Sequence, residues 1–121
     1  MFFTEAFPWF YLFNELKMRG FNVDVGFVTS HETDRDGKKI RRHREIDFVC
    51  NKGSKRYYIQ AALTLPNEAK WEQEQRPLLT TGDAFKKIII TKDALAPLYN
   101  DRGILVMNIF DFLLDANSLD L

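Results

Sequence analysis

Residues 44–63 contain the run Arg44-Glu45-Ile46-Asp47-Phe48-Val49-Cys50, a polar segment at 51–56, and the run Tyr57-Tyr58-Ile59-Gln60-Ala61-Ala62-Leu63. Two runs rich in β-branched and aromatic residues around a Lys-Gly-Ser-Lys centre are typical of a β-hairpin. A four-residue loop at Lys52 to Lys55 sets the register of the two strands. It places Cys50 opposite Tyr57, Val49 opposite Tyr58, and Asp47 opposite Gln60.

Side chains alternate along a strand, so this hairpin has two distinct faces. We expect one face to be core, and it carries Ile46, Phe48, Cys50, Ile59, Ala61 and Leu63. The other face carries Glu45, Asp47, Val49, Tyr58, Gln60 and Ala62. Asp47 lies at mid-strand on this second face, where an unpaired buried charge is costly. Its carboxylate therefore requires a partner.

Composition restricts the class of protein. A chain of 121 residues with 45% apolar and 14% aromatic residues is long enough for one core, which predicts a single domain over residues 1–121. The apolar runs are far shorter than the roughly 20 residues that cross a membrane. The N-terminus lacks the positively charged region of a signal peptide. Cys50 is the single cysteine, and we expect it to be buried and inert. These features favour a cytoplasmic protein.

The first part of the chain predicts a helix, a strand and a loop. The helix spans residues 5–19, with Thr4 as its cap and Gly20 as its stop, because Trp9, Leu12, Phe13 and Leu16 recur at helical spacing. The strand spans residues 22–28, with Val23, Val25 and Phe27 pointing inward. Residues 29–39 contain no apolar side chain, which predicts a mobile loop.

The second part of the chain predicts a crossover and a closing helix. Asn67 begins a helix anchored by Trp71 and ended or kinked by Pro77. Residues 86–91 form a short apolar strand of the kind that is buried at the centre of a sheet. A loop or short helix follows at 93–101, then a strand at 103–108 and a helix at 109–114 capped by Asn108. This order predicts an α/β fold with a mixed central sheet flanked by helices.

The order of elements resembles the restriction-endonuclease-like, or PD-(D/E)XK, nuclease fold with its αβββαβ core. Three segments carry a closer resemblance to the nuclease-like C-terminal domain appended to many predicted prokaryotic AAA-type ATPases. They are residues 13–21 (Phe-Asn-Glu-Leu-Lys-Met-Arg-Gly-Phe), 45–49 (Glu-Ile-Asp-Phe-Val) and 57–60 (Tyr-Tyr-Ile-Gln). The resemblance covers most of the chain and continues into residues 72–79, 87–91 and 109–114.

This resemblance implies a Mg²⁺ site that hydrolyses a phosphodiester. Glu15, Asp47 and Gln60 stand at the positions of the metal-binding and catalytic residues, with Gln60 in place of an acidic residue. Ala62 stands in place of the motif lysine, which leaves open whether the chain is an enzyme and favours an inactive one.

Other residues offer replacements or another explanation for this site. A relocated base would come from Lys70 or Arg76 of the second helix, and Glu45 is either an extra ligand or a partner of Arg42 or Arg44. The alternative is that Glu15 and Asp47 are inherited structural residues, neutralised by basic neighbours or by hydrogen bonds.

Charge is unevenly distributed in a chain whose net charge is zero. Residues 35–56 contain nine Lys or Arg against three acidic residues. Such a segment favours phosphate binding, or it is simply a solvated hairpin face. The candidate nucleic-acid-binding residues are Lys38, Lys39, Arg41, Arg42 and Arg44. His31 and His43 lack partners at zinc-ligand spacing and are expected at the surface. No phosphate-binding loop of the GxxxxGK[ST] kind occurs, so this chain is not itself an ATPase.

Three functions follow from these observations. The first is a degenerate nuclease-fold domain, retained as a nucleic-acid-binding or interaction module of an ATPase-type protein. The second is an active Mg²⁺-dependent DNA endonuclease. The third is a protein-interaction domain without a DNA role. The implied partners are DNA, an ATPase domain in the same chain or assembly, and a second copy of the chain. The apolar segment Met1-Phe2-Phe3 would then be half of an interface or a domain boundary.

Overall fold

The computed structural model describes residues 6–121. The expected helix cap Thr4 and the expected interface segment Met1-Phe2-Phe3 lie outside the described residues. The hairpin is present as β2 (Lys39–Lys52) and β3 (Lys55–Ala62), which pair in antiparallel fashion. Cys50 lies opposite Tyr57 and Lys52 opposite Lys55, which confirms the register predicted from the turn.

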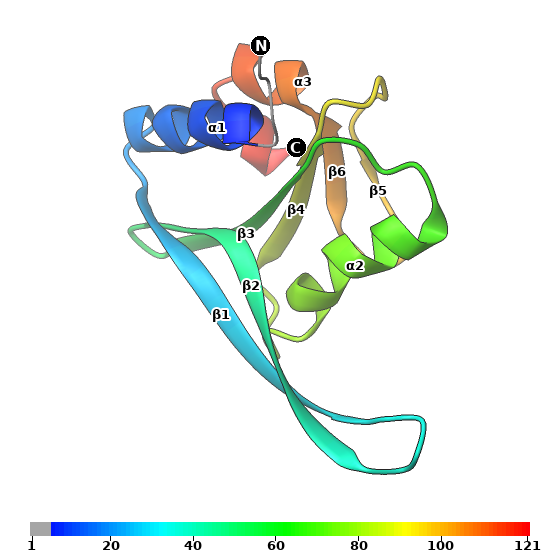
Figure 1. Cartoon of the computed structure of the whole chain (residues 1–121). Helices are drawn as coiled ribbons and strands as arrows, with labels where there is room; N and C mark the ends of the chain where they lie inside the picture. Colours follow the sequence, from blue (N-terminus) through cyan, green and yellow to red (C-terminus); the bar gives the residue numbers. More distant parts are fainter. Residues whose placement is uncertain (1–5) are drawn as a thin grey trace.

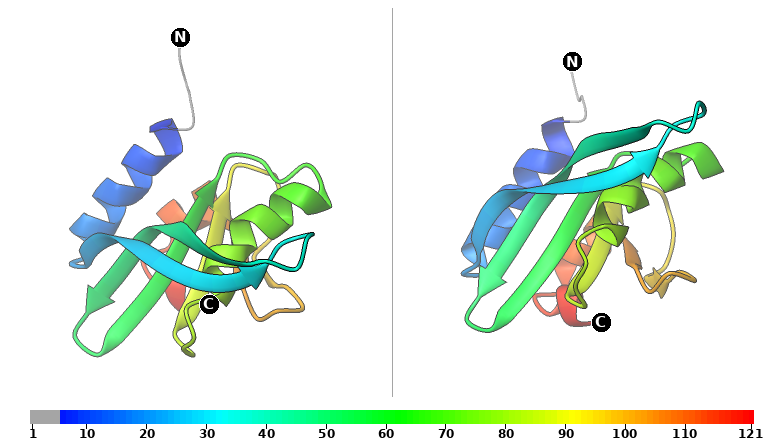
Figure 2. Two further views of the ribbon diagram at one scale, coloured as in Figure 1. Left: turned by 60° about the horizontal axis from the view of Figure 1, so that its bottom comes forward. Right: turned by 90° about the horizontal axis from the view of Figure 1, so that it is seen from below.

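A six-stranded sheet organises the fold, in the order β1-β2-β3-β4-β6-β5 (Figure 1). The remaining strands are β1 (Asn22–Thr33), β4 (Lys86–Thr91), β5 (Leu98–Tyr99) and β6 (Leu105–Asn108). The first three strands are antiparallel, β3, β4 and β6 run parallel, and β5 is an antiparallel edge. The helices are α1 (Ala6–Met18), α2 (Glu68–Leu79), α3 (Ile109–Leu114) and the short 3-10 helix η1 (Ser118–Asp120). Figure 2 shows α1 and α2 on opposite sides of the sheet, which confirms an α/β fold with a mixed sheet flanked by helices.

Helix α1 ends through its predicted glycine stop. Gly20 has a φ of +90°, a conformation that glycine adopts without steric cost. Its N–H donates to Lys17 O at 3.0 Å, and the N–H of Phe21 donates to Leu16 O at 3.1 Å. This is the hydrogen-bond pattern of a Schellman motif, with Phe21 and Leu16 both buried in the same apolar cluster. The chain is thereby turned from α1 into β1.

The core consists of two layers, one on each face of the sheet. The layer under α1 and α3 contains Leu12, Leu16, Phe48, Ile59, Ile88, Ile90 and Phe112. The layer under α2 contains Ile46, Tyr58, Ala62, Leu78, Ile89 and Val106. Strand β4 contributes to both layers, as predicted for a central strand. Both faces of the hairpin are therefore buried, which agrees with the prediction of helices on both sides of the sheet.

A β-bulge in β2 changes the faces that its first residues occupy. Asp24 pairs with Val49 but Gly26 pairs with Ile46, so β2 contains one more residue than β1 between these pairs. Ile46 therefore packs under α2 with Tyr58, and not with Phe48 as predicted. A Cβ atom on Gly26 would lie 2.5 Å from Val49 Cγ2 and 3.2 Å from Ile46 Cβ, which explains the glycine beside this bulge.

Near the bulge, Val25, Phe27 and Glu45 lie in environments that differ from those predicted. Val25 and Phe27 were expected to point inward, but they are 44% and 74% exposed. Val28 packs against the layer under α2 in their place. Glu45 was expected to lie opposite Ala62 near Asp47, but it is exposed and pairs with Phe27. It is therefore not an additional residue of the Asp47 face.

Strands β1 and β2 continue beyond the bulge as a two-stranded ribbon, residues 27–45, which we call the arm (Figure 1). The predicted loop at 29–39 was wrong, because β1 extends to Thr33 and only residues 34–38 form the turn. Asp34 organises this turn. Its N–H donates to Lys38 O at 2.9 Å, and its Oδ1 accepts hydrogen bonds from the N–H groups of Asp36 and Lys38. The ribbon is polar because it covers little of the core.

The remaining elements mostly follow the sequence. Asn67 Oδ1 accepts the Lys70 N–H at 2.9 Å and Asn108 Oδ1 accepts the Phe110 N–H at 2.7 Å, so both predicted caps are confirmed. Pro77 does not end α2, which continues to Leu79, and the short strand β5 was not predicted. Cys50 is fully buried, as expected, and burial raises the pKa of its thiol to about 12. In the described part of the chain, no helix is long and apolar enough to span a membrane.

Candidate functional site

The strands β2 and β3 separate at Asp47 and Gln60, and the side chains of these two residues bridge the gap. The backbone pairing ends at Phe48 and Ile59. Beyond that point, the Asp47 N–H donates to Gln60 Oε1 at 2.8 Å, and the Ala61 N–H donates to Asp47 Oδ2 at 2.8 Å. Gln60 is 4% exposed, and its Nε2 donates to Glu74 O of α2 at 3.3 Å. Asp47 and Gln60 therefore lie together, as the register predicted, and they replace backbone hydrogen bonds.

These contacts give Asp47 a structural role that can be tested. We expect Asp47→Ala to lower the free energy of unfolding by about 1–3 kcal/mol, because the Ala61 N–H loses its acceptor. Asp47→Asn retains a side-chain oxygen and is expected to lose less than half as much. Urea denaturation followed by circular dichroism measures both. A gain in stability for Asp47→Ala would contradict this role, since removal of a strained functional carboxylate commonly stabilises a fold.

Lys70 lines the same pocket as Asp47, and the resemblance would require a base near this residue. Both residues line a pocket of about 220 Å³ between β3 and α2, together with Ala62 and Glu74. The Lys70 ammonium is 3.3 Å from Glu74 Oε2, so its charge is already paired on the same helix. Arg76 lines a different pocket, with Arg44 of the arm. Of the two predicted replacements, only Lys70 therefore shares a pocket with Asp47.

Glu15 is separated from Asp47 and has another partner. Its Oε2 is 2.7 Å from Arg19 Nε, and Arg19 is only 8% exposed at its side chain. The Arg19 guanidinium also donates to Ser118 Oγ at 3.0 Å and to the carbonyl oxygens of Phe112 and Asp115. Lys52 donates to Arg19 O at 2.7 Å, whereas Asp47 lines a pocket with α2, which lies on the other side of the sheet from α1. Glu15 therefore contributes to a clamp on the C-terminal segment.

The residues that the resemblance assigns to Mg²⁺ do not form a common ligand set. Gln60 Oε1 is engaged by the Asp47 N–H, and Glu15 is held by Arg19. Within residues 6–121, no three His, Cys, Asp or Glu side chains are grouped so as to hold a metal ion. Mg²⁺ requires several oxygen ligands in a near-octahedral arrangement. The arrangement of Glu15, Asp47 and Gln60 therefore does not fit this ion.

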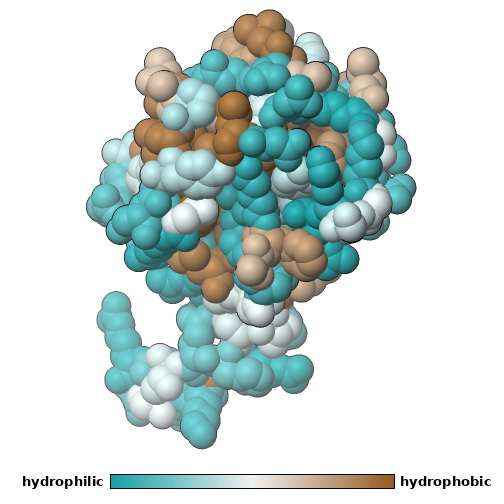
Figure 3. Space-filling model, turned by 180° about the vertical axis from the view of Figure 1, so that it is seen from behind, coloured by the Kyte–Doolittle hydropathy of each residue, from teal (hydrophilic) through white to brown (hydrophobic). Residues whose placement is uncertain are grey.

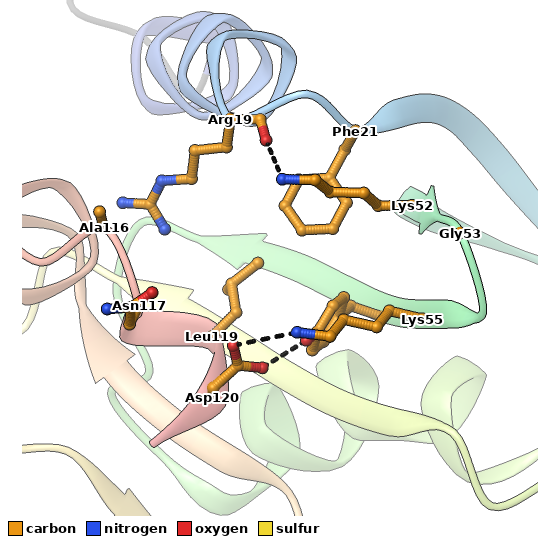
Figure 4. A pocket seen from close by; sticks show the side chains of 10 residues that line it. Arg19, Phe21, Lys52, Gly53, Lys55, Ala116, Asn117, Leu119 and Asp120 are labelled. Atoms are coloured by element: carbon orange, nitrogen blue, oxygen red, sulfur yellow. Dashed lines mark hydrogen bonds and ion pairs between the residues drawn. The ribbon is translucent and has the colours of Figure 1, made fainter.

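A larger pocket of about 470 Å³ lies between the hairpin turn and η1, where Figure 4 shows Arg19, Lys52 and Lys55 around it. Lys55 Nζ is 3.7 Å from Asp120 Oδ2, and the Tyr57 hydroxyl also donates to Asp120. The Tyr57 hydrogen bond holds the pKa of Asp120 below its usual value, and burial raises the pKa of Tyr57 to about 12. Each of the three cations contacts an acceptor within the fold, so this pocket is a structural junction.

The five predicted nucleic-acid-binding residues all lie on the arm. Figure 3 shows the arm as a hydrophilic projection from the body of the molecule. Lys38 is at its turn, and Lys39, Arg41, Arg42 and Arg44 follow along β2. His31 and His43 are exposed on the arm, as expected for surface residues. Of these cations, Lys38 and Lys39 were predicted on a mobile loop, whereas the structure places Lys38 in the turn and Lys39 at the start of β2.

Glu32, which was not among the predicted functional residues, is the acidic partner of Arg42 and Arg44. Its carboxylate is 2.7 Å from Arg44 Nη1 and 3.5 Å from Arg42 Nε, and Ser30 Oγ donates to it at 2.7 Å. The Ser30 hydrogen bond and the Arg44 guanidinium lower the pKa of Glu32. Glu45, which was considered as a partner for these arginines, does not form this ion pair. The sequence feature that could have indicated this ion pair is a single Glu among the polar residues of β1.

Comparison with known proteins gives one relative and no family. No family model matches the chain, and no solved structure matches it significantly. An uncharacterised protein from Haemophilus influenzae is 34% identical over 103 residues. The matched region is 85% of this chain but only 22% of the relative. The chain thus spans about a fifth of the length of the curated relative that it matches.

Proposed function

We propose that this chain is a nucleic-acid-binding domain with a restriction-endonuclease-like fold whose nuclease chemistry has been lost. The observation that carries the proposal is the arm, which holds six Lys and Arg residues, Arg35 and the five predicted above, on a ribbon that projects from the folded body. A basic projection of this kind attracts the phosphate backbone of nucleic acids, which supplies most of the affinity of sequence-independent binding. The proposed partner is DNA.

The order of elements supports the restriction-endonuclease-like part of the proposal. A helix, three antiparallel strands, a helical crossover and a parallel strand follow one another as in the αβββαβ core. The position of the motif lysine is Ala62, which is 4% exposed beneath α2. Asp47 and Gln60 hydrogen-bond to the backbone of the facing strands, and Gln60 also to α2. The remnant of the motif thus serves the fold.

A second candidate function is a Mg²⁺-dependent DNA endonuclease. One observation favours it, namely that Lys70 and Asp47 line the same pocket. The ligand arrangement described for Glu15, Asp47 and Gln60 weighs against it.

The length of the Haemophilus influenzae relative supports a further part of the proposal. The region similar to this chain is 22% of that protein. A domain of this kind would therefore serve as the DNA-binding part of a longer protein, which the resemblance suggests is of the ATPase type.

Fluorescence anisotropy with a labelled DNA duplex tests the proposed function. We expect binding whose logarithmic affinity falls linearly with the logarithm of salt concentration, with a slope of about −2 or steeper. The same samples are then incubated with plasmid DNA and Mg²⁺ or Mn²⁺, and no cleavage is expected. An absence of binding at low salt would favour a protein-interaction domain without a DNA role. Cleavage that disappears in both Asp47→Ala and Lys70→Met would establish the second candidate.

A further inference from the structure

The arm has two faces that differ in exposure. Residues paired across the two strands share a face, so the register assigns each residue of the two strands to one of the two faces. The outer face consists of Phe27, Thr29, His31, Thr33, Lys39, Arg41, His43 and Glu45, all of which are exposed. The inner face consists of Val28, Ser30, Glu32, Ile40, Arg42 and Arg44, of which all but Arg42 are partly buried. The inner face turns toward α2, since Arg44 and Arg76 line one pocket.

The cations of the inner face are engaged within the protein. Glu32 forms ion pairs with both Arg42 and Arg44, and the Arg44 side chain is only 17% exposed. Arg44 Nη1 also donates to Ser30 Oγ at 3.4 Å. A phosphate group that approached this face would compete with Glu32 for the two guanidinium groups. The inner arginines are therefore better suited to holding the two strands together.

The cations of the outer face are presented to solvent. Lys39 and Arg41 are two residues apart on β2, so their side chains project from the same face roughly 6.8 Å apart along the strand. Within the described residues, neither side chain forms an ion pair with an acidic group. Glu45, the acidic residue of this face, is four residues from Arg41, roughly 13 Å away along the strand. Thr29 and Thr33 add hydroxyl groups, which commonly bond to phosphate oxygens.

The shape of the arm selects among nucleic acids. The DNA major groove is about 12 Å wide and about 8.5 Å deep, and it admits a two-stranded β-ribbon. Residues 27–33 of β1 extend over roughly 20 Å, which is enough to reach across this depth. The major groove of A-form RNA is too narrow to receive such a ribbon. Duplex DNA is therefore the partner that fits the arm.

We propose that the arm lies in the major groove of duplex DNA with its outer face toward the nucleic acid, and that Lys39 and Arg41 bind phosphates. This inference rests on the proposed DNA-binding function and adds to it the face, the groove and the two contacting residues. Arg42 and Arg44, although equally basic in the sequence, position the ribbon through Glu32 and do not contact DNA.

Two double variants that remove the same charge test this inference. Lys39→Ser with Arg41→Ser changes the outer face, and Arg42→Ser with Arg44→Ser changes the inner face. We expect the outer variant to weaken duplex binding by at least about tenfold at 0.1 M salt, and to reduce the salt slope by about 1.8. The inner variant is expected to reduce the slope by less than about 0.5. An equal or larger loss in the inner variant would overturn the inference.

A third variant covers the case in which the inner variant disturbs the ribbon. Glu32→Gln releases both inner arginines while keeping the shape of the side chain, and we expect less than about a threefold change in affinity. A gain of about tenfold or more would place DNA on the inner face. A double-stranded RNA of the same sequence serves as the shape control, and binding as tight as that of DNA would exclude the groove geometry.

The outcomes separate this inference from the function on which it rests. If the parent chain binds no duplex at low salt, the proposed function is wrong and the inference falls with it. If the parent binds duplex DNA and the outer variant binds equally well, the proposed function stands and the inference alone is overturned. Circular dichroism and thermal melting of each variant establish that the compared proteins are folded.

Discussion

Phe48→Ala is expected to lower the free energy of unfolding by about 3–5 kcal/mol. Phe48 of β2 is fully buried in the layer beneath α1 and α3. Its ring stacks on Trp9 of α1 with a centroid distance of 5.2 Å, so it joins the helix to the sheet. The sheet holds the surrounding side chains in place, and the cavity left by the ring would close only partly.

Urea denaturation monitored by circular dichroism measures this loss, with Phe110→Ala as the matched control. Phe110 belongs to α3 and is 62% exposed, so the same chemical change there is expected to alter stability by less than about 0.5 kcal/mol. A loss below about 1 kcal/mol for Phe48→Ala would show that the Phe48 ring is not tightly packed beneath α1 and α3.

Arg19→Ala is expected to lower the free energy of unfolding by about 3 kcal/mol, because the guanidinium group joins α1 to the C-terminal segment. It is bound to Glu15, to Ser118 Oγ, and to the carbonyl oxygens of Phe112 and Asp115. It also lies 4.3 Å from the centroid of the Phe112 ring, within reach of a cation–π interaction. Removal of Arg19 leaves these acceptors without their shared donor.

Arg19→Lys separates the contribution of the guanidinium hydrogen bonds to stability from that of the positive charge. A lysine ammonium keeps the charge but cannot reproduce the planar set of donors, so we expect it to restore less than half of the loss. Hydrogen exchange at residues 115–121 provides the local readout, since these residues are expected to lose protection in both variants. A lysine variant as stable as the parent, with unchanged protection, would show that charge alone is sufficient.

The sequence predicted those parts of the fold that depend on local chemistry. The hairpin register followed from the position of the turn, and Gly20, Asn67 and Asn108 were identified from capping preferences. Each of these features is decided by a few neighbouring residues. The central position of β4 followed from a continuous apolar run, which both core layers require.

The bulge and the arm were missed for different physical reasons. The alternation of polar and apolar residues does not show where an extra residue is inserted into a strand. The sequence feature that indicates the bulge is Gly26, because the absence of a side chain there leaves space for Val49 and Ile46. The arm was interpreted as a loop because it lacks apolar residues, although Asp36-Gly37 is a recognised hairpin-turn dipeptide. A ribbon that projects into solvent has no face that must be apolar.

The candidate site was predicted in part. Asp47 and Gln60 were paired correctly by the hairpin register, since both belong to one local motif. Glu15 was assigned to them from its place in the resemblance, but its contacts depend on Arg19, one helical turn away, and on the distant C-terminal segment. Long-range contacts of this kind are set by the packing of whole elements, and the sequence of α1 alone does not specify them.

Excision of the arm is the most direct test of whether the arm binds DNA. In this variant, residues 30–42 are replaced by Asn-Gly, a dipeptide that favours a tight hairpin turn between the paired residues Thr29 and His43. None of the removed residues belongs to either core layer, so the body is expected to unfold at nearly the same temperature. We expect duplex DNA binding to fall by about 100-fold or more at 0.1 M salt. A folded variant that binds DNA as tightly as the parent would contradict this expectation.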